Sequence, residues 1–110
     1  MAQGAVCVVL FTAASGEEAA RIGKTLVEEN LAACVNVVPA VRSIFRWEGK
    51  LCDETEALGV VKTRKDRVEA LTARVKALHT YKLPEVIALD VSGGSAEYLA
   101  WVTENSGVLK

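Results

Sequence analysis

The sequence predicts an α+β fold, a ferredoxin-like sandwich of βαββαβ order with a long hairpin between its second and third strands and a C-terminal helix. Three observations lead to this prediction. Apolar stretches of strand composition alternate with amphipathic helical stretches. The middle of the chain, residues 31–50, is an extended apolar arm that ends in a tight turn. No repeat or linker interrupts the 110 residues, so we expect one domain over residues 1–110.

The first strand is predicted over residues 5–12 and the first helix over residues 16–30. The strand segment, AVCVVLFT, is almost continuously apolar, which is typical of a central strand covered on both faces. Ser15 and Glu18 have the spacing of a capping box, which marks the start of a helix. Apolar residues follow at helical spacing, at Ala19, Ile22, Leu26 and Val27.

The arm supplies the second strand, predicted over residues 32–44, and returns as a third strand over residues 51–62. Pro39 lacks a backbone donor and predicts an edge, bulge or bend near the middle of the arm. The Glu48-Gly49-Lys50 segment reverses the chain. We expect Glu54 and Glu56, which alternate on one face of the third strand, to pair with Arg42 or Arg46 across the hairpin.

The second helix is predicted to begin at a capping box formed by Thr63 and Asp66 and to end near His79. The last strand is predicted over residues 86–91 and follows Pro84. Gly93, Gly94 and Ser95 stop that strand and cap a short final helix. The apolar stripe of the second helix consists of Val68, Leu71, Val75 and Leu78. The stripe of the final helix consists of Tyr98, Leu99, Trp101 and Val102.

This order of elements predicts an uncovered sheet face. Right-handed crossovers place both main helices on one side of the four strands. The central strands are nevertheless apolar on both sides, and a bare apolar sheet face is a strong signal of association. We therefore expect the chain to assemble with further copies of itself, and we expect Trp47 on the projecting arm to anchor an interface. A ligand that stacks on the tryptophan is the alternative.

Composition excludes several other classes of protein. Lys and Arg number 13 against 14 Asp and Glu, so no uniform positive field exists to bind nucleic acid. The apolar run over residues 5–14 is too short to span a membrane, and no basic cluster precedes it. The three cysteines, Cys7, Cys34 and Cys52, lie far apart and outside any zinc-binding spacing, which indicates free thiols.

Several motifs, in order along nearly the whole chain, resemble the CutA family of divalent-cation tolerance proteins. They are LAACVN at residues 31–36, WEGK at residues 47–50, VKT at residues 61–63, HTYKLPE at residues 79–85 and YLAW at residues 98–101. The resemblance implies a stable cytoplasmic homotrimer, similar in architecture to the PII signalling proteins, that binds divalent metal, copper above all. In such a trimer Pro39, Phe45, Trp47 and Trp101 are the expected interface residues.

His79 and Glu85 are the candidate metal ligands. His79 is the only histidine, and a helix-to-strand turn can bring it close to Glu85, which follows six residues later. Imidazole and carboxylate together suit copper or zinc. Some members of the family carry a cysteine where this chain has Phe11, so a thiolate site at that position cannot be carried over. The alternative role of His79 is a helix C-terminal residue whose positive form interacts with the helix dipole.

A second candidate is an anion site. Backbone amides and cationic side chains at the junction of the third strand and the second helix would form it, together with residues of the turn after that helix. A capped helix with solvated basic residues is the alternative. The candidate residues are Lys62, Thr63, Arg64, Tyr81 and Lys82.

The sequence thus favours a non-catalytic homotrimer that binds divalent metal and contributes to metal tolerance. The alternative is a PII-like regulatory or scaffold trimer that binds a small anionic metabolite at clefts between subunits. An enzyme is not expected, because a single histidine has to serve any nucleophile and base pair, and no phosphate-binding glycine motif is present.

Overall fold

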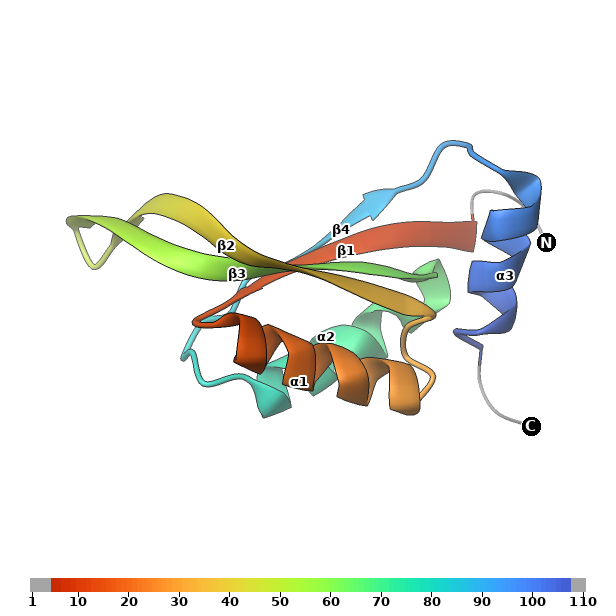
Figure 1. Cartoon of the computed structure of the whole chain (residues 1–110), viewed down its shortest axis with the longest axis horizontal. Coiled ribbons are helices and arrows are strands. Elements are labelled where there is room, and N and C mark those ends of the chain that lie inside the picture. Colours follow the sequence, from red (N-terminus) through yellow and green to blue (C-terminus); the bar gives the residue numbers. More distant parts are fainter. Residues whose placement is uncertain (1–4, 108–110) are drawn as a thin grey trace.

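A computed structural model describes residues 5–107 and confirms the predicted order of elements (Figure 1). A short 3-10 turn, η2, precedes the second helix. The elements are β1 (Val6–Ala13), α1 (Gly16–Glu28), β2 (Cys34–Trp47), β3 (Lys50–Arg64), η2 (Lys65–Arg67), α2 (Val68–Leu78), β4 (Val86–Asp90) and α3 (Ala96–Glu104). No helix within this range is long and apolar enough to cross a membrane.

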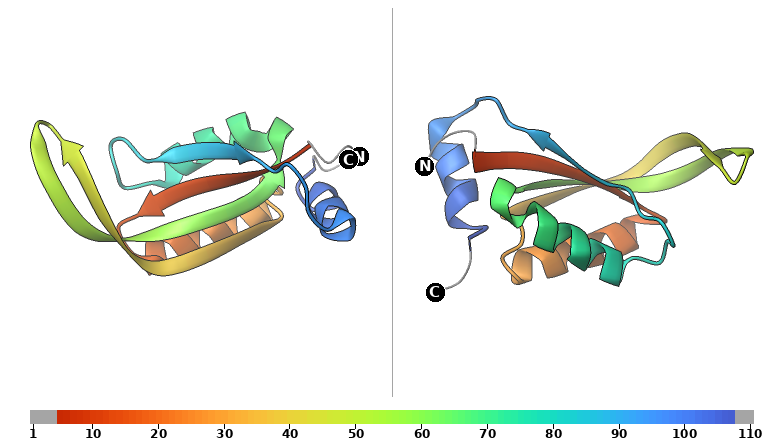
Figure 2. Two further views of the ribbon diagram at one scale, coloured as in Figure 1. Left: turned by 90° about the horizontal axis from the view of Figure 1, so that it is seen from above. Right: turned by 180° about the vertical axis from the view of Figure 1, so that it is seen from behind.

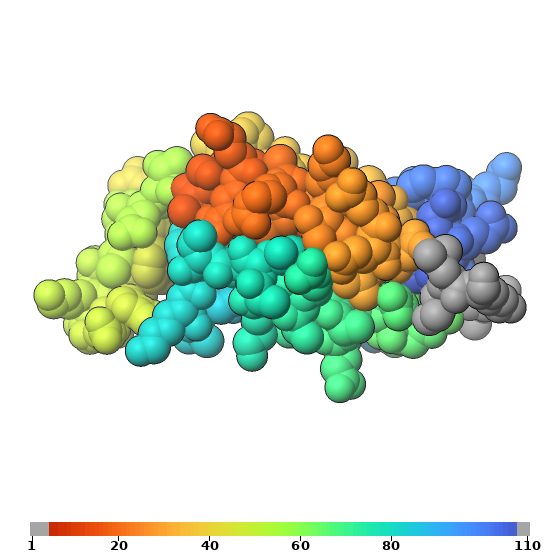
Figure 3. Space-filling model, turned by 90° about the horizontal axis from the view of Figure 1, so that it is seen from below, coloured from red at the N-terminus to blue at the C-terminus, as the bar shows by residue number. Residues whose placement is uncertain are grey.

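The four strands form one antiparallel sheet in the order β2-β3-β1-β4. Both α1 and α2 lie on one side of it, and α3 lies beyond its end (Figures 1 and 2). Seen from the helical side, α1 and α2 lie next to each other across the middle of the molecule (Figure 3). This is the ferredoxin-like arrangement that the order of elements predicts.

The core lies between the sheet and these two helices. Side chains alternate across each strand, so Val9 and Phe11 of β1 and Val61 of β3 share the helical face and are fully buried. Their partners on the helices include Ile22, Leu26, Leu71 and Val75, which are also fully buried. The apolar stripes predicted for α1 and α2 therefore face the sheet, except Val27, which is 39% exposed.

The opposite face of the sheet is apolar and is not covered by any element of residues 5–107, as the sequence predicts. Ile87 and Leu89 of β4 are 50% and 51% exposed. They lie opposite Leu10 and Val8 of β1, so these four side chains share one face. We call this surface the open face; it consists of Val8, Leu10, Val38, Leu58, Val60, Ile87 and Leu89.

The hairpin of β2 and β3 projects from the rest of the protomer, and the longest dimension of the whole molecule is 45 Å (Figure 1). Trp47 pairs with Lys50, and the two residues between them both have positive φ, 50° at Glu48 and 79° at Gly49. Two consecutive positive φ angles define the tight turn that matches the twist of paired strands. The register shifts between Val38 and Val41, beside Pro39, as its missing donor predicts.

The predicted start of the second helix is wrong. Thr63 does not cap the second helix, because β3 continues to Arg64; the Thr63 side chain is buried and its hydroxyl donates to the Leu31 carbonyl at 2.7 Å. The helix α2 begins only at Val68, after η2, with no side-chain cap. The capping box predicted at the start of α1 is confirmed in part: Ser15 Oγ accepts a hydrogen bond from the Glu18 amide at 3.1 Å.

The ion pairs predicted between the glutamates and arginines of the hairpin do not form. Arg42 donates to both carboxylate oxygens of Asp53, at 2.8 and 2.6 Å. Glu54 and Glu56 instead lie opposite Ser43 and Val41. The two glutamates therefore point away from the arginines and toward the domain body.

Candidate functional site

The candidate site is a cleft of about 910 Å³ between the hairpin and the loop that joins α2 to β4. One wall comes from β2 and β3, and the other comes from residues 80–85. The lining residues are Thr12, Ser43, Ile44, Phe45, Trp47, Glu48, Cys52, Glu54, Glu56, Thr80, Tyr81, Lys82, Leu83, Pro84 and Glu85. A volume of this size is in the range of small-molecule sites.

The cleft is acidic. Four of its lining residues are glutamates, and Lys82 is its one cation. Within residues 5–107, none of these four carboxylates takes part in an ion pair. The four carboxylates without an ion pair are Glu48, Glu54, Glu56 and Glu85. Their negative charge favours a cationic occupant.

Glu56 is the most buried of these carboxylates, with 8% of its surface exposed. Its Oε2 accepts a hydrogen bond from the Tyr81 hydroxyl at 2.7 Å. A carboxylate removed from water without a countercharge is costly, and a single neutral donor compensates it only in part. Burial, together with the charge of Glu56, holds the pKa of Tyr81 far above its ordinary value, so the phenol remains a proton donor.

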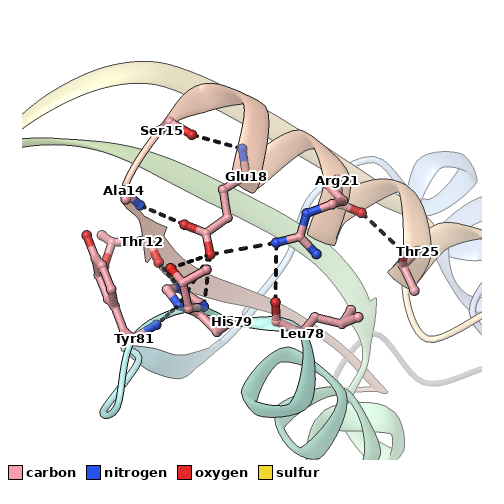
Figure 4. A network of polar contacts seen from close by, with 10 residues as sticks. Thr12, Ala14, Ser15, Glu18, Arg21, Thr25, Leu78, His79 and Tyr81 are labelled. Carbon is pink, nitrogen blue, oxygen red and sulfur yellow. Dashed lines mark hydrogen bonds and ion pairs between the residues drawn. The ribbon is translucent and has the colours of Figure 1, made fainter.

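A buried polar network holds the wall that carries Tyr81 (Figure 4). The Glu18 carboxylate, 8% exposed, accepts from the Ala14 amide at 3.1 Å and from the Thr80 amide and hydroxyl at 3.0 and 2.8 Å. Arg21 lies 3.8 Å from the same carboxylate and donates to the Leu78 carbonyl. The start of α1 is thereby fastened to the loop that follows α2.

His79 belongs to this network and not to the cleft wall. Its ring is fully buried, with Nε2 2.7 Å from the Thr12 carbonyl and Nδ1 3.0 Å from the Tyr81 amide. A carbonyl only accepts and an amide only donates, so the neutral Nε2–H tautomer satisfies both contacts. A metal ion on His79 requires the loss of one of these two hydrogen bonds.

The second candidate ligand, Glu85, lies in the cleft wall and is exposed. Within residues 5–107 no group of three or more His, Cys, Asp or Glu side chains is arranged to hold a metal ion. The ligand pair of His79 and Glu85 stays a prediction, and the structure places only Glu85 where an ion from solvent reaches it directly.

The candidate anion-site residues are not brought together in one protomer. Lys62 contacts Asn36, and Arg64 contacts Asp66. Thr63 belongs to β3 and is fully buried, whereas Tyr81 and Lys82 line the cleft near the other end of β3. The separation follows from the extended conformation of β3 through Arg64, which replaces the helix start that the sequence suggested.

The candidate interface residues lie on accessible parts of the protomer. Trp47 and Trp101 are each 42% exposed, and Trp101 lies against Tyr98 with ring centroids 5.6 Å apart. Pro39 is exposed at the irregular point of β2, and Phe45 is half-buried in the cleft wall. Their role in assembly stays a prediction.

Sequence reasoning missed the cleft and the network behind it. Glu18 has the expected position for a capping box, and nothing in its local spacing indicates that it bonds to Thr80, 62 residues away. Glu56 carried a weak signal, because a charged residue directly precedes the apolar run of residues 57–61. Contacts between distant segments are needed to interpret either carboxylate.

Known proteins are similar to this chain in sequence and in fold. Residues 7–105 match the family model described as CutA1 divalent ion tolerance protein. The divalent-cation tolerance protein CutA of Thermus thermophilus is 51% identical over 100 residues, which cover 91% of this chain and 97% of the relative. The chloroplastic protein CutA of Arabidopsis thaliana is 43% identical over 99 residues, but the match spans only 54% of its length.

Solved structures agree with the sequence matches. The divalent cation tolerance protein Cut A1 of Thermus thermophilus superposes with a TM-score of 0.90 at 50% identity, covering 93% of this chain and 99% of that one. The periplasmic divalent cation tolerance protein CutA of Archaeoglobus fulgidus gives a TM-score of 0.89 at 40% identity, with coverage of 93% and 99%. The arrangement of strands and helices is therefore shared over almost the whole chain.

Proposed function

The chain belongs to the CutA1 divalent ion tolerance protein family, and from this premise we propose that it is a homotrimer that binds divalent cations in its acidic cleft. The observation that carries the proposal is the set of four cleft glutamates that have no ion pair among the described residues. The relatives are named for cation tolerance and not for a reaction, which supports binding in place of catalysis.

The donors in the cleft fit a divalent cation in chemistry but not in number. Carboxylate oxygens are ligands for divalent ions, and the thiol of Cys52, also in the wall, is a softer donor that suits copper or zinc. Since one protomer gathers no group of three such donors within residues 5–107, water or a neighbouring subunit supplies the remaining ligands. Copper(II) is the first ion to test because it ranks highest in the general order of divalent affinities.

The open face supports assembly with further copies. It presents apolar side chains of all four strands, including Ile87 and Leu89, and no other part of the described chain covers them. Contact with other copies removes this surface from water. The free thiols of Cys7, Cys34 and Cys52 support a reducing compartment, and we propose the cytoplasm.

Calorimetry with Cu²⁺, Zn²⁺ and Mg²⁺ tests the cation site. Glu56→Gln keeps an acceptor for the Tyr81 hydroxyl but removes the charge, so we expect cation affinity to fall at least roughly tenfold, or about 1.4 kcal/mol. Glu69→Gln, an exposed glutamate on α2 outside the cleft, is the matched control and should leave affinity unchanged. Unchanged affinity in Glu56→Gln together with a loss in His79→Ala would return the site to His79 and Glu85.

Light scattering tests the assembly. We expect a mass of three times the 11.8 kDa of the chain, and we expect Leu89→Lys to shift the protein to smaller species, because it places a charge on the open face. Val27→Lys is the control, since Val27 is 39% exposed on α1, on the other side of the sheet. A monomeric parent protein at micromolar concentration would contradict the proposed trimer.

A further inference from the structure

The outer part of the β2–β3 hairpin, residues 41–56, extends beyond the rest of the sheet (Figures 1 and 2); we call it the distal hairpin. β1 pairs with β3 only as far as Ala57, so no third strand flanks the distal hairpin among residues 5–107. One side-chain hydrogen bond joins it to the rest of the described chain, from the Tyr81 hydroxyl to Glu56 Oε2 at 2.7 Å. Its other side-chain hydrogen bonds and its ion pair stay within the hairpin.

The distal hairpin begins at an interruption of the pairing between β2 and β3. Two residues of β2, Pro39 and Ala40, lie opposite the single residue Ala57 of β3, as in a β-bulge. A bulge disrupts the ladder and bends the strand, and proline has no amide hydrogen to contribute. Continuous pairing therefore does not fix the direction of the distal hairpin. Glu56 is the first residue of β3 on the distal side of this bulge.

The partner of Glu56 is anchored in the rest of the protomer. The Tyr81 amide donates to His79 Nδ1 at 3.0 Å, and the two rings lie 4.6 Å apart. The preceding residue, Thr80, donates to the Glu18 carboxylate through its amide and its hydroxyl. Because the backbone on this side is held by α1, the hydrogen bond to Glu56 constrains the hairpin.

The distal hairpin carries large apolar side chains that are exposed in the protomer. They are Ile44, Trp47 and Leu51. A two-stranded hairpin is marginally stable without further packing, and exposed apolar side chains are typical of a surface that contacts another chain. Ordering a mobile segment at the moment of binding lowers the affinity. A fixed direction of the hairpin therefore favours its contact with a second copy.

Resting on the assembly proposed above, we infer that the hydrogen bond between Tyr81 and Glu56 is a latch that fixes the direction of the distal hairpin and so presents its apolar side chains to a second copy of the chain. Tyr81 is thus a positioning residue for assembly, and it acts from within the protomer. When the latch is open, only a fraction of the protomers has the competent hairpin direction, and the apparent affinity falls by that fraction.

Sedimentation velocity with fluorescence detection, over a dilution series, measures the effect on assembly. Tyr81→Phe removes the hydroxyl and keeps the ring, so we expect the protein concentration of half-dissociation to rise roughly tenfold, the lower range for a hydrogen bond to a charged group. Thr25→Val is the control: it also removes a hydroxyl, but that hydroxyl donates to the Arg21 carbonyl within α1. An unchanged half-dissociation concentration in Tyr81→Phe would overturn the inference.

A double variant separates positioning from compensation of charge. Tyr81→Phe also leaves the buried Glu56 carboxylate without its donor, which by itself lowers stability. Adding Glu56→Ala removes this carboxylate, so we expect stability to recover in part while assembly stays weakened, because the latch is still absent. Full recovery of assembly in the double variant would mean that Tyr81 only compensates the charge, and the latch would fall.

Fluorine NMR follows the distal hairpin directly. The chain has two tryptophans, so 5-fluorotryptophan gives two resonances, and Trp101→Phe identifies the one from Trp47. The measurement uses Leu89→Lys, in which we expect the copies to be separated. Adding Tyr81→Phe should broaden the Trp47 resonance or move it toward its position in urea, and should leave Trp101 in place. An unchanged Trp47 resonance contradicts the latch.

The two proposals fail in distinguishable ways. If the parent protein is a trimer, and Tyr81→Phe neither weakens assembly nor changes the Trp47 resonance, the assembly stands and the latch falls. If the parent protein is monomeric at micromolar concentration, the assembly falls, and the role of Tyr81 in presenting the hairpin falls with it.

Discussion

Replacing Gly59 with alanine is expected to lower the free energy of unfolding by about 3 kcal/mol, the upper range for overpacking of a tight core. Gly59 lies opposite Phe11 in the sheet, and the ring of Phe11 covers it. A Cβ at residue 59 would come 2.1 Å from a ring carbon. Both residues are buried, and Phe11 is fully enclosed, so the ring has no free space into which it can move.

Urea denaturation at fixed protein concentration measures this loss, since the stability of an oligomer depends on concentration. Gly93→Ala is the matched control: a Cβ there meets nothing within 4 Å, and we expect a change below about 0.5 kcal/mol. Adding Phe11→Leu to Gly59→Ala should recover part of the loss, because the smaller side chain relieves the overlap. A double variant that is less stable than the sum of the two single changes would contradict the clash.

The second large effect is expected at Glu18. Glu18→Ala leaves the Ala14 and Thr80 amides without their acceptor, and the site is buried, so we expect a loss of about 3 kcal/mol. Hydrogen exchange of the Thr80 and Tyr81 amides should accelerate at the same time. Glu17→Ala removes an adjacent, exposed carboxylate from the same helix turn and should cost less than about 1 kcal/mol.

Acid should remove the contribution of Glu18. Burial by itself raises the pKa of this carboxyl, but the hydrogen bonds from Thr80 and Ala14 and the nearby His79 outweigh burial, and its pKa lies below the ordinary 4.5. A lowered folded pKa means that the contribution is complete above the unfolded value and is lost as pH falls through the folded one. The stability difference between the parent protein and Glu18→Gln should therefore be constant near pH 7 and shrink below about pH 4.5. A difference that grows in acid would contradict the network.

The sequence was sufficient to predict the fold because its signals are local. The β-branched run of β1, the Ser15 cap, the turn at Glu48 and Gly49, and the helical stripes each depend on residues a few positions apart. The order of these elements then leaves few topologies. The start of α2 was predicted too early because Thr63 and Asp66 satisfy a local capping rule, whereas pairing with β1 keeps β3 extended through Arg64.

The candidate site was predicted less well because its contacts are not local. Glu85 lies in an accessible wall of the cleft. His79, which was expected close to it, is instead enclosed by Thr12, Tyr81 and Glu18. Glu56 was expected to pair with Arg42 or Arg46 across the hairpin and is instead the buried carboxylate of the cleft. Alternation along a strand predicts which side chains share one face of the sheet, but it does not predict which distant segment packs against that face.

The sequence alone therefore determined the family, the order of strands and helices, and the presence of an apolar sheet face that the protomer leaves open. Periodicity and turn chemistry act over a few residues and can be read along the chain. Only the tertiary structure decided that Glu18 fastens Thr80, that Tyr81 compensates Glu56, and that an acidic cleft lies between hairpin and loop. These features arise where segments 25 to 62 residues apart meet, and such meetings depend on how the sheet and helices pack.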